Sequence, residues 1–95
     1  MFVVVLTYRR PIEEVERHLA EHIDFLDAQY QAGVFVASGR RVPRTGGVIL
    51  AISVDQVSLT QILDLDPFKR EGIADYEIVE FVPNRTKPGL EALME

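Results

Sequence analysis

The chain contains no cysteine and no tryptophan among its 95 residues. Without cysteine, a disulfide framework, a thiolate metal site and a cysteine nucleophile are all excluded. Proline and glycine are also scarce, at five and six residues, which excludes collagen-like and low-complexity chains. The apolar run at residues 2–6 has no basic flank and is too short for a signal or membrane-spanning segment. We therefore expect a cytoplasmic protein with no membrane partner.

Positive charge is in short supply as well. Ten Lys and Arg residues face 15 Asp and Glu residues, for a net charge of −5. A nucleic-acid partner is not expected, because binding a phosphate backbone needs clustered basic side chains. One local cluster exists at Arg40, Arg41 and Arg44. It is interpreted either as a solvated loop or as a small anion site at the mouth of a pocket, and three arginines are too few for a nucleic-acid tract.

The remaining composition is typical of a globular domain, with 47% hydrophobic and 26% charged residues. A chain of this length has room for one core. We expect a single domain over residues 1–95, in which residues 83–95 form a C-terminal tail. The end of that tail, residues 90–95, has the composition of a short helix.

Hydrophobic periodicity and turn residues predict the order β-α-β-β-α-β. The expected strands are residues 2–8, 34–37, 48–52 and 74–82. The first helix is expected from residue 12 to about residue 32 and the second from residue 56 to about residue 65. Residues 38–47 and 68–72 are expected to be loops. Right-handed crossovers then give an α+β, ferredoxin-like fold: a four-stranded antiparallel sheet with two helices on one face.

The first and third predicted strands are apolar on both faces, although two helices cover only one face of the sheet. An open face of several valine and isoleucine side chains is larger than soluble monomers usually expose. We therefore expect a homodimer in which a second copy packs against this face, and further pairing of dimers is left open. The alternative cover, the C-terminal tail, has only one short apolar stretch.

The first helix carries the two histidines of the chain. Its apolar stripe is predicted from residues 12, 15, 19, 23, 26 and 30, which places His22 at the edge between core and solvent. On position alone His22 is a border histidine bonded to the backbone; the alternative is a functional imidazole in a cleft. His18 and His22 have the spacing of a helical zinc pair, but no third ligand accompanies them. No metal and no cofactor are expected, and His18 is interpreted as a surface residue.

Asp66 differs from the other acidic residues because it follows an apolar helix and precedes Pro67. One interpretation is an aspartate that caps the backbone of a short helical turn. The other is a carboxylate that orients His22 as a catalytic dyad, with His22 as general acid or base. A carboxylate has two oxygens, so the two roles are compatible. Four further groups are candidates for binding a substrate near this pair: Tyr8, Ser38, Phe68, and Arg40 or Arg41.

These features together resemble the YCII-related proteins. The resemblance is carried by His22 in the first helix, Gly33 after it, the turn Ala37-Ser38-Gly39, and Asp66-Pro67-Phe68 followed by Gly72. It runs from about residue 2 to residue 83. Two positions depart from the family pattern. Leu19 stands where relatives often have arginine, and Gly39-Arg40 stands where they often have Gly-Pro.

The resemblance implies the dimeric α/β-barrel superfamily and a site built on His22 and Asp66. Some relatives act on small ring compounds, among them a dehydrochlorinase and, more distantly, muconolactone isomerases. The leading hypothesis is therefore a cofactor-free lyase or isomerase that transfers a proton on a small, anionic or cyclic metabolite. The alternative is a non-catalytic metabolite-binding or accessory protein of the same fold, and the residue chemistry alone does not separate the two.

Overall fold

The computed structural model describes residues 1–94. Its elements follow the predicted order, with each helical region divided in two: β1 (Phe2–Tyr8), α1 (Ile12–Arg17), α2 (Leu19–Gln31), β2 (Phe35–Arg40), β3 (Gly46–Ala51), α3 (Gln56–Leu63), α4 (Pro67–Arg70), β4 (Ala74–Glu80) and a 3₁₀ turn η1 (Glu91–Met94). The strands form one sheet in the order β2-β3-β1-β4, with every neighbouring pair antiparallel. The predicted ferredoxin-like fold is confirmed.

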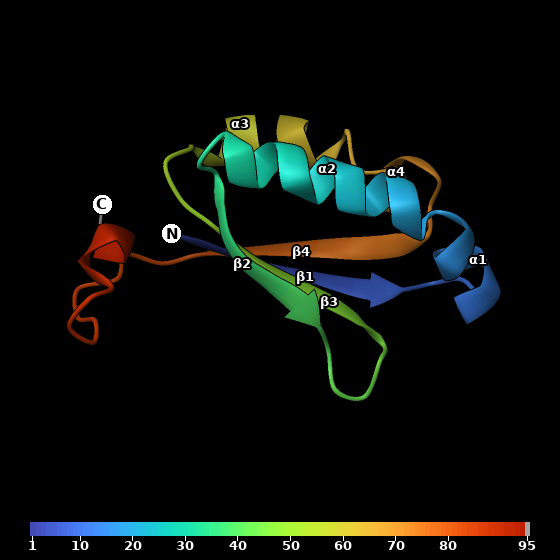
Figure 1. Cartoon of the computed structure of the whole chain (residues 1–95), viewed down its shortest axis with the longest axis horizontal. Helices are drawn as coiled ribbons and strands as arrows, with labels where there is room; N and C mark the ends of the chain where they lie inside the picture. The colour runs from blue at the N-terminus through green and yellow to red at the C-terminus, as the bar shows by residue number, and fades with distance from the viewer. Residues whose placement is uncertain (95) are drawn as a thin grey trace.

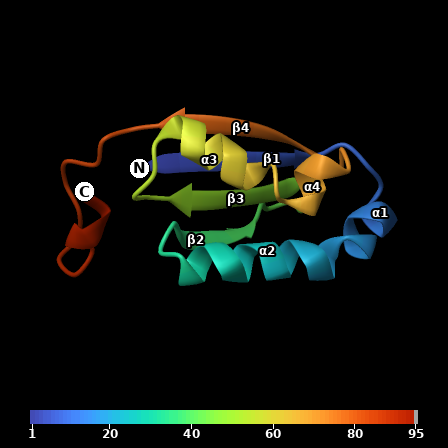
Figure 2. The same cartoon turned by 90° about the horizontal axis from the view of Figure 1, so that it is seen from above.

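The helices α2, α3 and α4 lie on one face of the sheet (Figure 1). Seen from above, α2 runs along the β2 side of the sheet, whereas α3 and α4 lie over the β1 and β4 side (Figure 2). The short helix α1 lies at the end of the sheet where β1 finishes, opposite the C-terminal turn. None of the helices in residues 1–94 combines the length and the apolar character needed to cross a membrane.

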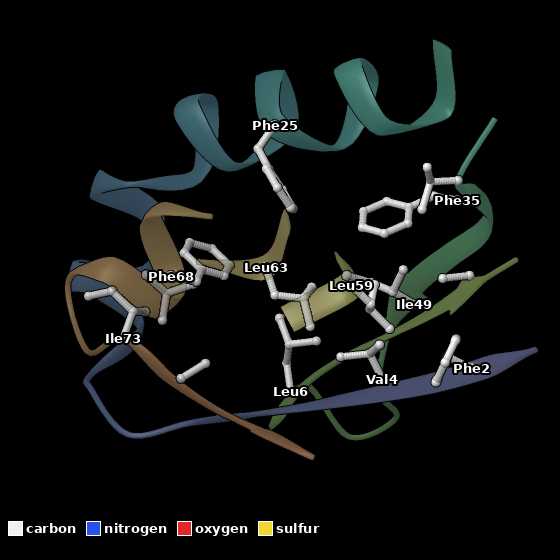
Figure 3. Packing of buried hydrophobic residues seen from close by; sticks show 14 residues of the cluster. Phe2, Val4, Leu6, Phe25, Phe35, Ile49, Leu59, Leu63, Phe68 and Ile73 are labelled. Carbon is white, nitrogen blue, oxygen red and sulfur yellow. The ribbon is translucent and has the colours of Figure 1, made fainter. Parts of the chain in front are cut away.

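The core lies between the sheet and these helices (Figure 3). Alternate residues of β1 point into it, and Phe2, Val4 and Leu6 are all nearly inaccessible to solvent. They meet Leu59 and Leu63 of α3, which are fully buried. Each such side chain contributes about 1.5–3 kcal/mol relative to its exposed state. Phe25 of α2 and Phe68 of α4 belong to the same core, which holds these two helices at fixed positions above the sheet.

The first predicted helix is not continuous, which corrects the sequence-based expectation. It is interrupted at His18, whose backbone has φ −105° and ψ 5°, between α1 and α2. After the break, the buried residues of α2 are His22 and Phe25, whereas Ile23, placed in the predicted stripe, is 46% exposed. The helix is thus rotated by about one position relative to the prediction, and His22 faces the core more directly than expected.

Strand β2 is longer than predicted and takes in Ser38, Gly39 and Arg40, which were assigned to a loop. Pairing with β3 explains the difference, since Gly39 lies opposite Val48 and Arg40 opposite Gly47. The loop proper is residues 41–45. Gly46 then brings β3 so close to β1 that a Cβ atom there would lie 1.8 Å from the Leu6 carbonyl oxygen.

The C-terminal part of the chain also differs from the prediction. Strand β4 ends at Glu80, short of the predicted residue 82, and Phe81 after it is 43% exposed. The expected terminal helix is present as the 3₁₀ turn η1, and residue 95 lies outside the described residues. The tail leaves the sheet at one end and does not return over its open face (Figure 1).

The open face carries the predicted second set of apolar side chains. Val3 pairs with Leu50, and Val5 pairs with Val48. These four residues alternate with buried residues of β1 and β3 and therefore lie on the opposite face of the sheet, the face that the helices do not cover. Val79 of β4 lies opposite Val3 and is 48% exposed.

Candidate functional site

His22 and Asp66, which are 44 positions apart, meet in the folded chain. The Nδ1 atom of His22 lies 2.8 Å from Oδ1 of Asp66, so the predicted contact between α2 and the start of α4 is present. His22 is 9% exposed and Asp66 is 0% exposed. A buried hydrogen bond of this kind fixes the orientation of the imidazole ring.

The local sequence explains why Asp66 stays in place. Its backbone is extended, Pro67 begins α4, and Oδ1 of Asp66 accepts a hydrogen bond from the backbone N–H of Phe68 at 3.0 Å. This is an N-terminal helix cap, in which proline at the first position costs no hydrogen bond. The capping role predicted for Asp66 is therefore present together with the contact to His22.

Phe68 holds the imidazole from one face. The two rings are stacked, with centroids 4.0 Å apart and planes inclined by 5°. Tyr8 meets Phe68 edge to face, with centroids 6.1 Å apart. The position of Phe68 is in turn set by the cap, since Asp66 binds its N–H. Asp66 therefore positions His22 both directly and through Phe68.

A cavity of about 270 Å³ lies beside His22. It is open to solvent on one side and is bordered by the inner face of the sheet near the end of β1, by α2 and by Phe68 of α4. Four of the predicted binding residues line it together with His22: Tyr8, Ser38, Arg40 and Phe68. Asp66 is not part of the wall and lies behind the imidazole.

The wall of the cavity is mostly apolar and carries positive charge. Arg40 and Arg44 both line it, and no Asp or Glu is among the described residues of the wall. Nη1 of Arg44, in the loop after β2, lies 3.6 Å from Oε1 of Glu16 near the end of α1. In a chain with a net charge of −5, a wall of this kind favours an anionic ligand over a cationic one.

Arg41, the other arginine predicted as a candidate, is not among the residues of the cavity wall. Its guanidinium donates a hydrogen bond to the Thr7 hydroxyl at 3.0 Å. Adjacent residues of a strand point to opposite faces, so Arg40 and Arg41 diverge where β2 ends. Ser38 does reach the cavity, but its hydroxyl is already hydrogen-bonded to the Tyr30 hydroxyl at 2.6 Å.

Tyr76 is a member of the site that the sequence analysis did not identify. Its hydroxyl donates a hydrogen bond to the second carboxylate oxygen of Asp66, Oδ2. Burial raises the pKa of Tyr76 well above its usual range, and the negative charge of Asp66 and their hydrogen bond raise it further. Tyr76 lies within the predicted strand 74–82, but no pattern along the strand indicates which polar group its hydroxyl would meet.

Among residues 1–94, no group of three or more His, Cys, Asp or Glu side chains is arranged to hold a metal ion. His18 sits at the break between α1 and α2 and does not line the cavity.

Comparison with known proteins supports the resemblance seen in the sequence. The family model described as the YCII-related domain matches residues 1–82. Among solved structures, the fold is similar to that of 5-chloro-2-hydroxyhydroquinone dehydrochlorinase (TftG) from Burkholderia phenoliruptrix AC1100, in complex with 2,5-dihydroxybenzoquinone. The TM-score is 0.70 at 14% sequence identity, and the match covers 85% of this chain and 93% of that one. A search of curated protein sequences finds no match.

Proposed function

Because the chain belongs to the YCII-related family, whose model matches residues 1–82, we propose that it is a small, cofactor-free enzyme of the lyase or isomerase type. It transfers a proton on a small metabolite. The observation that carries this proposal is the buried contact between His22 and Asp66 at the wall of a cavity of about 270 Å³. The alternative remains a metabolite-binding protein that uses the same cavity without chemistry.

In the proposed mechanism, His22 is the general base and then the general acid. Its Nδ1 is engaged by Asp66, which leaves Nε2 as the ring nitrogen available to a substrate. The ionised carboxylate stabilises the imidazolium that forms when Nε2 takes a proton. Stacking on Phe68 holds the plane of the ring, so the substrate must present its proton in that plane.

The lining of the cavity supports a small anionic or cyclic substrate. Arg40 supplies a cation to a wall that is otherwise mostly apolar, and Arg44, which is paired with Glu16, supplies a second guanidinium. Both departures from the family pattern, Leu19 and Arg40, are part of this wall. A guanidinium is thus present at the end of β2, whereas the α2 position often occupied by arginine in relatives is apolar here. The quinone bound to the dehydrochlorinase is a ring of a size compatible with such a cavity.

The proposal is tested on the native protein in two steps. Small carboxylic acids, phenols and lactones are first screened by thermal shift, since a ligand that binds the native state raises the melting temperature. Each ligand found is then incubated with the protein in D₂O, and exchange of its acidic C–H protons is followed by NMR. Exchange above the buffer rate supports the enzyme. Binding without exchange or turnover supports the alternative function.

We also propose that the working form is a homodimer in which the open faces of two sheets pack together. The support is the row of apolar side chains formed by Val3, Val5, Val48 and Leu50, which no element of residues 1–94 covers. Burying this row against its own copy removes apolar surface from water under two-fold symmetry. Association of such dimers and the expected cytoplasmic location both remain predictions.

Sedimentation equilibrium checks the dimer. The native protein is expected to have twice the mass of one chain. Leu50→Lys is expected to lower the mass to that of one chain, because the introduced lysines would be buried unpaired in the interface. Val57→Lys is the matched control, since Val57 is 70% exposed on α3, in the other layer. A native protein that sediments as one chain would contradict the proposal.

A further inference from the structure

Asp66 receives hydrogen bonds from three different elements. His22 of α2 and the backbone N–H of Phe68 in α4 share Oδ1, at 2.8 Å and 3.0 Å. The Tyr76 hydroxyl of β4 binds Oδ2. The side chain of Asp66 is completely buried, so these contacts replace the water that would otherwise solvate the carboxylate. Each contact consequently affects where the carboxylate points.

The direction of each hydrogen bond can be worked out from the donors. The backbone N–H of Phe68 can only donate. The hydroxyl of Tyr76 donates as well, because its raised pKa keeps the phenol protonated and Asp66 offers an acceptor. With two donors already directed at it, the carboxylate is set up to accept from His22 as well. This arrangement favours the tautomer in which the proton between His22 and Asp66 lies on Nδ1 of the imidazole.

The surroundings of Tyr76 in the sheet give its hydroxyl no packing role, which leaves the hydrogen bond to Asp66 as its contribution. Its neighbours on the inner face of β4 are Ala74 and Ile78, and it lies opposite Leu6 of β1. A phenylalanine would keep this packing, and also the contact of the ring with the Lys69 ammonium, which lies 5.8 Å from the ring centroid. Tyr76 does not line the cavity, so it does not touch a ligand held there.

We propose that Tyr76 is a positioning residue that acts on His22 through Asp66. By holding Oδ2, it fixes the rotation of the carboxylate so that Oδ1 stays aimed at Nδ1 of His22. The neutral imidazole is then held with its proton on Nδ1 and its lone pair on Nε2, which is the opposite of the tautomer that free histidine favours in water. Its importance for turnover rests on the proposed function, but its effect on the tautomer does not.

The tautomer is measured directly by two-bond ¹H–¹⁵N NMR of the imidazole nitrogens, at a pH where His22 is neutral. In the native protein, Nδ1 is expected to show the protonated signature and Nε2 the lone-pair signature. In Tyr76→Phe, the ratio of the two tautomers is expected to fall by roughly tenfold, which is the equivalent of one hydrogen bond to a charged group. Tyr8→Phe is the control, because Tyr8 also packs on Phe68 and its hydroxyl is not bonded to Asp66.

Two results would overturn the proposal. One is a native His22 with its proton on Nε2, and the other is a Tyr76→Phe protein whose imidazole signals match those of the native protein. If Tyr76→Phe does not fold, the hydroxyl proton of Tyr76 is observed in the native protein instead. A slowly exchanging resonance shifted far downfield supports the contact, and a freely exchanging one contradicts it.

These results are independent of the proposed function. Suppose that the native protein has the expected His22 tautomer but exchanges no proton of any bound ligand. The proposed enzyme activity would then be refuted, whereas the positioning role of Tyr76 would stand. Once a substrate is identified, Tyr76→Phe is expected to lower kcat and leave KM nearly unchanged, since Tyr76 does not reach the cavity.

Discussion

Replacing His22 by glutamine is expected to lower turnover of an identified substrate by about 10²–10⁴-fold, the usual contribution of a general acid or base. A glutamine amide can still donate a hydrogen bond to Asp66, but it cannot take up a proton at neutral pH. Binding of the substrate should change little, because the two arginines of the cavity wall remain. The measurement is steady-state turnover, with ligand binding followed separately by calorimetry.

The matched control for this prediction is His18→Gln. His18 is the other histidine of the chain and precedes His22 by one helical turn, but it lies outside the cavity wall. Its replacement should leave turnover within about twofold of the native value, as expected for a residue remote from the chemistry. If His22→Gln kept native turnover while folding normally, the acid–base role of the imidazole would be wrong.

Replacing Asp66 by alanine is expected to destabilise the protein by roughly 3–5 kcal/mol, the usual loss when one partner of a buried pair is removed. Asp66 is 0% exposed, so water cannot readily replace the carboxylate. The donors from His22, Phe68 and Tyr76 would all lose their acceptor. The free energy of unfolding is measured by urea denaturation at one fixed protein concentration.

Asp55→Ala is the control that separates burial from capping. Asp55 also caps a helix, since its Oδ1 accepts a hydrogen bond from the backbone N–H of Ser58 at 2.7 Å, but it is exposed to solvent. Its replacement should cost clearly less than that of Asp66, because water can satisfy the freed N–H of α3. Equal losses would mean that Asp66 acts as a helix cap alone.

The fold could be predicted from the sequence because its signals are local. Alternating apolar residues define β1, Gly33 ends α2 with a φ of 77°, and Pro67 begins α4. The break at His18 could not be predicted, because neither proline nor glycine is present between Arg17 and Leu19. Without it, the apolar stripe of the helix was placed about one position away from the face that is buried.

The candidate site was predictable only in part, for a related reason. Asp66 stood out because Pro67 and Phe68 follow it, which is a short-range pattern. The contact of Tyr76 with Asp66 is set by how β4 is placed beneath α4, and no spacing along the chain encodes it. The opposite courses of Arg40 and Arg41 likewise depend on pairing between β2 and β3, which extended the strand beyond its apolar residues.

Because Asp66 has both a structural and a proposed functional role, its presence is a poor marker of activity among related sequences. One carboxylate both caps α4 and contacts the imidazole, so a relative that lacks the proposed activity would still need it to fold. The presence of this aspartate in another chain thus says little about whether that chain is an enzyme. The histidine, whose removal leaves the helix cap untouched, is the more informative position for telling active relatives from inactive ones.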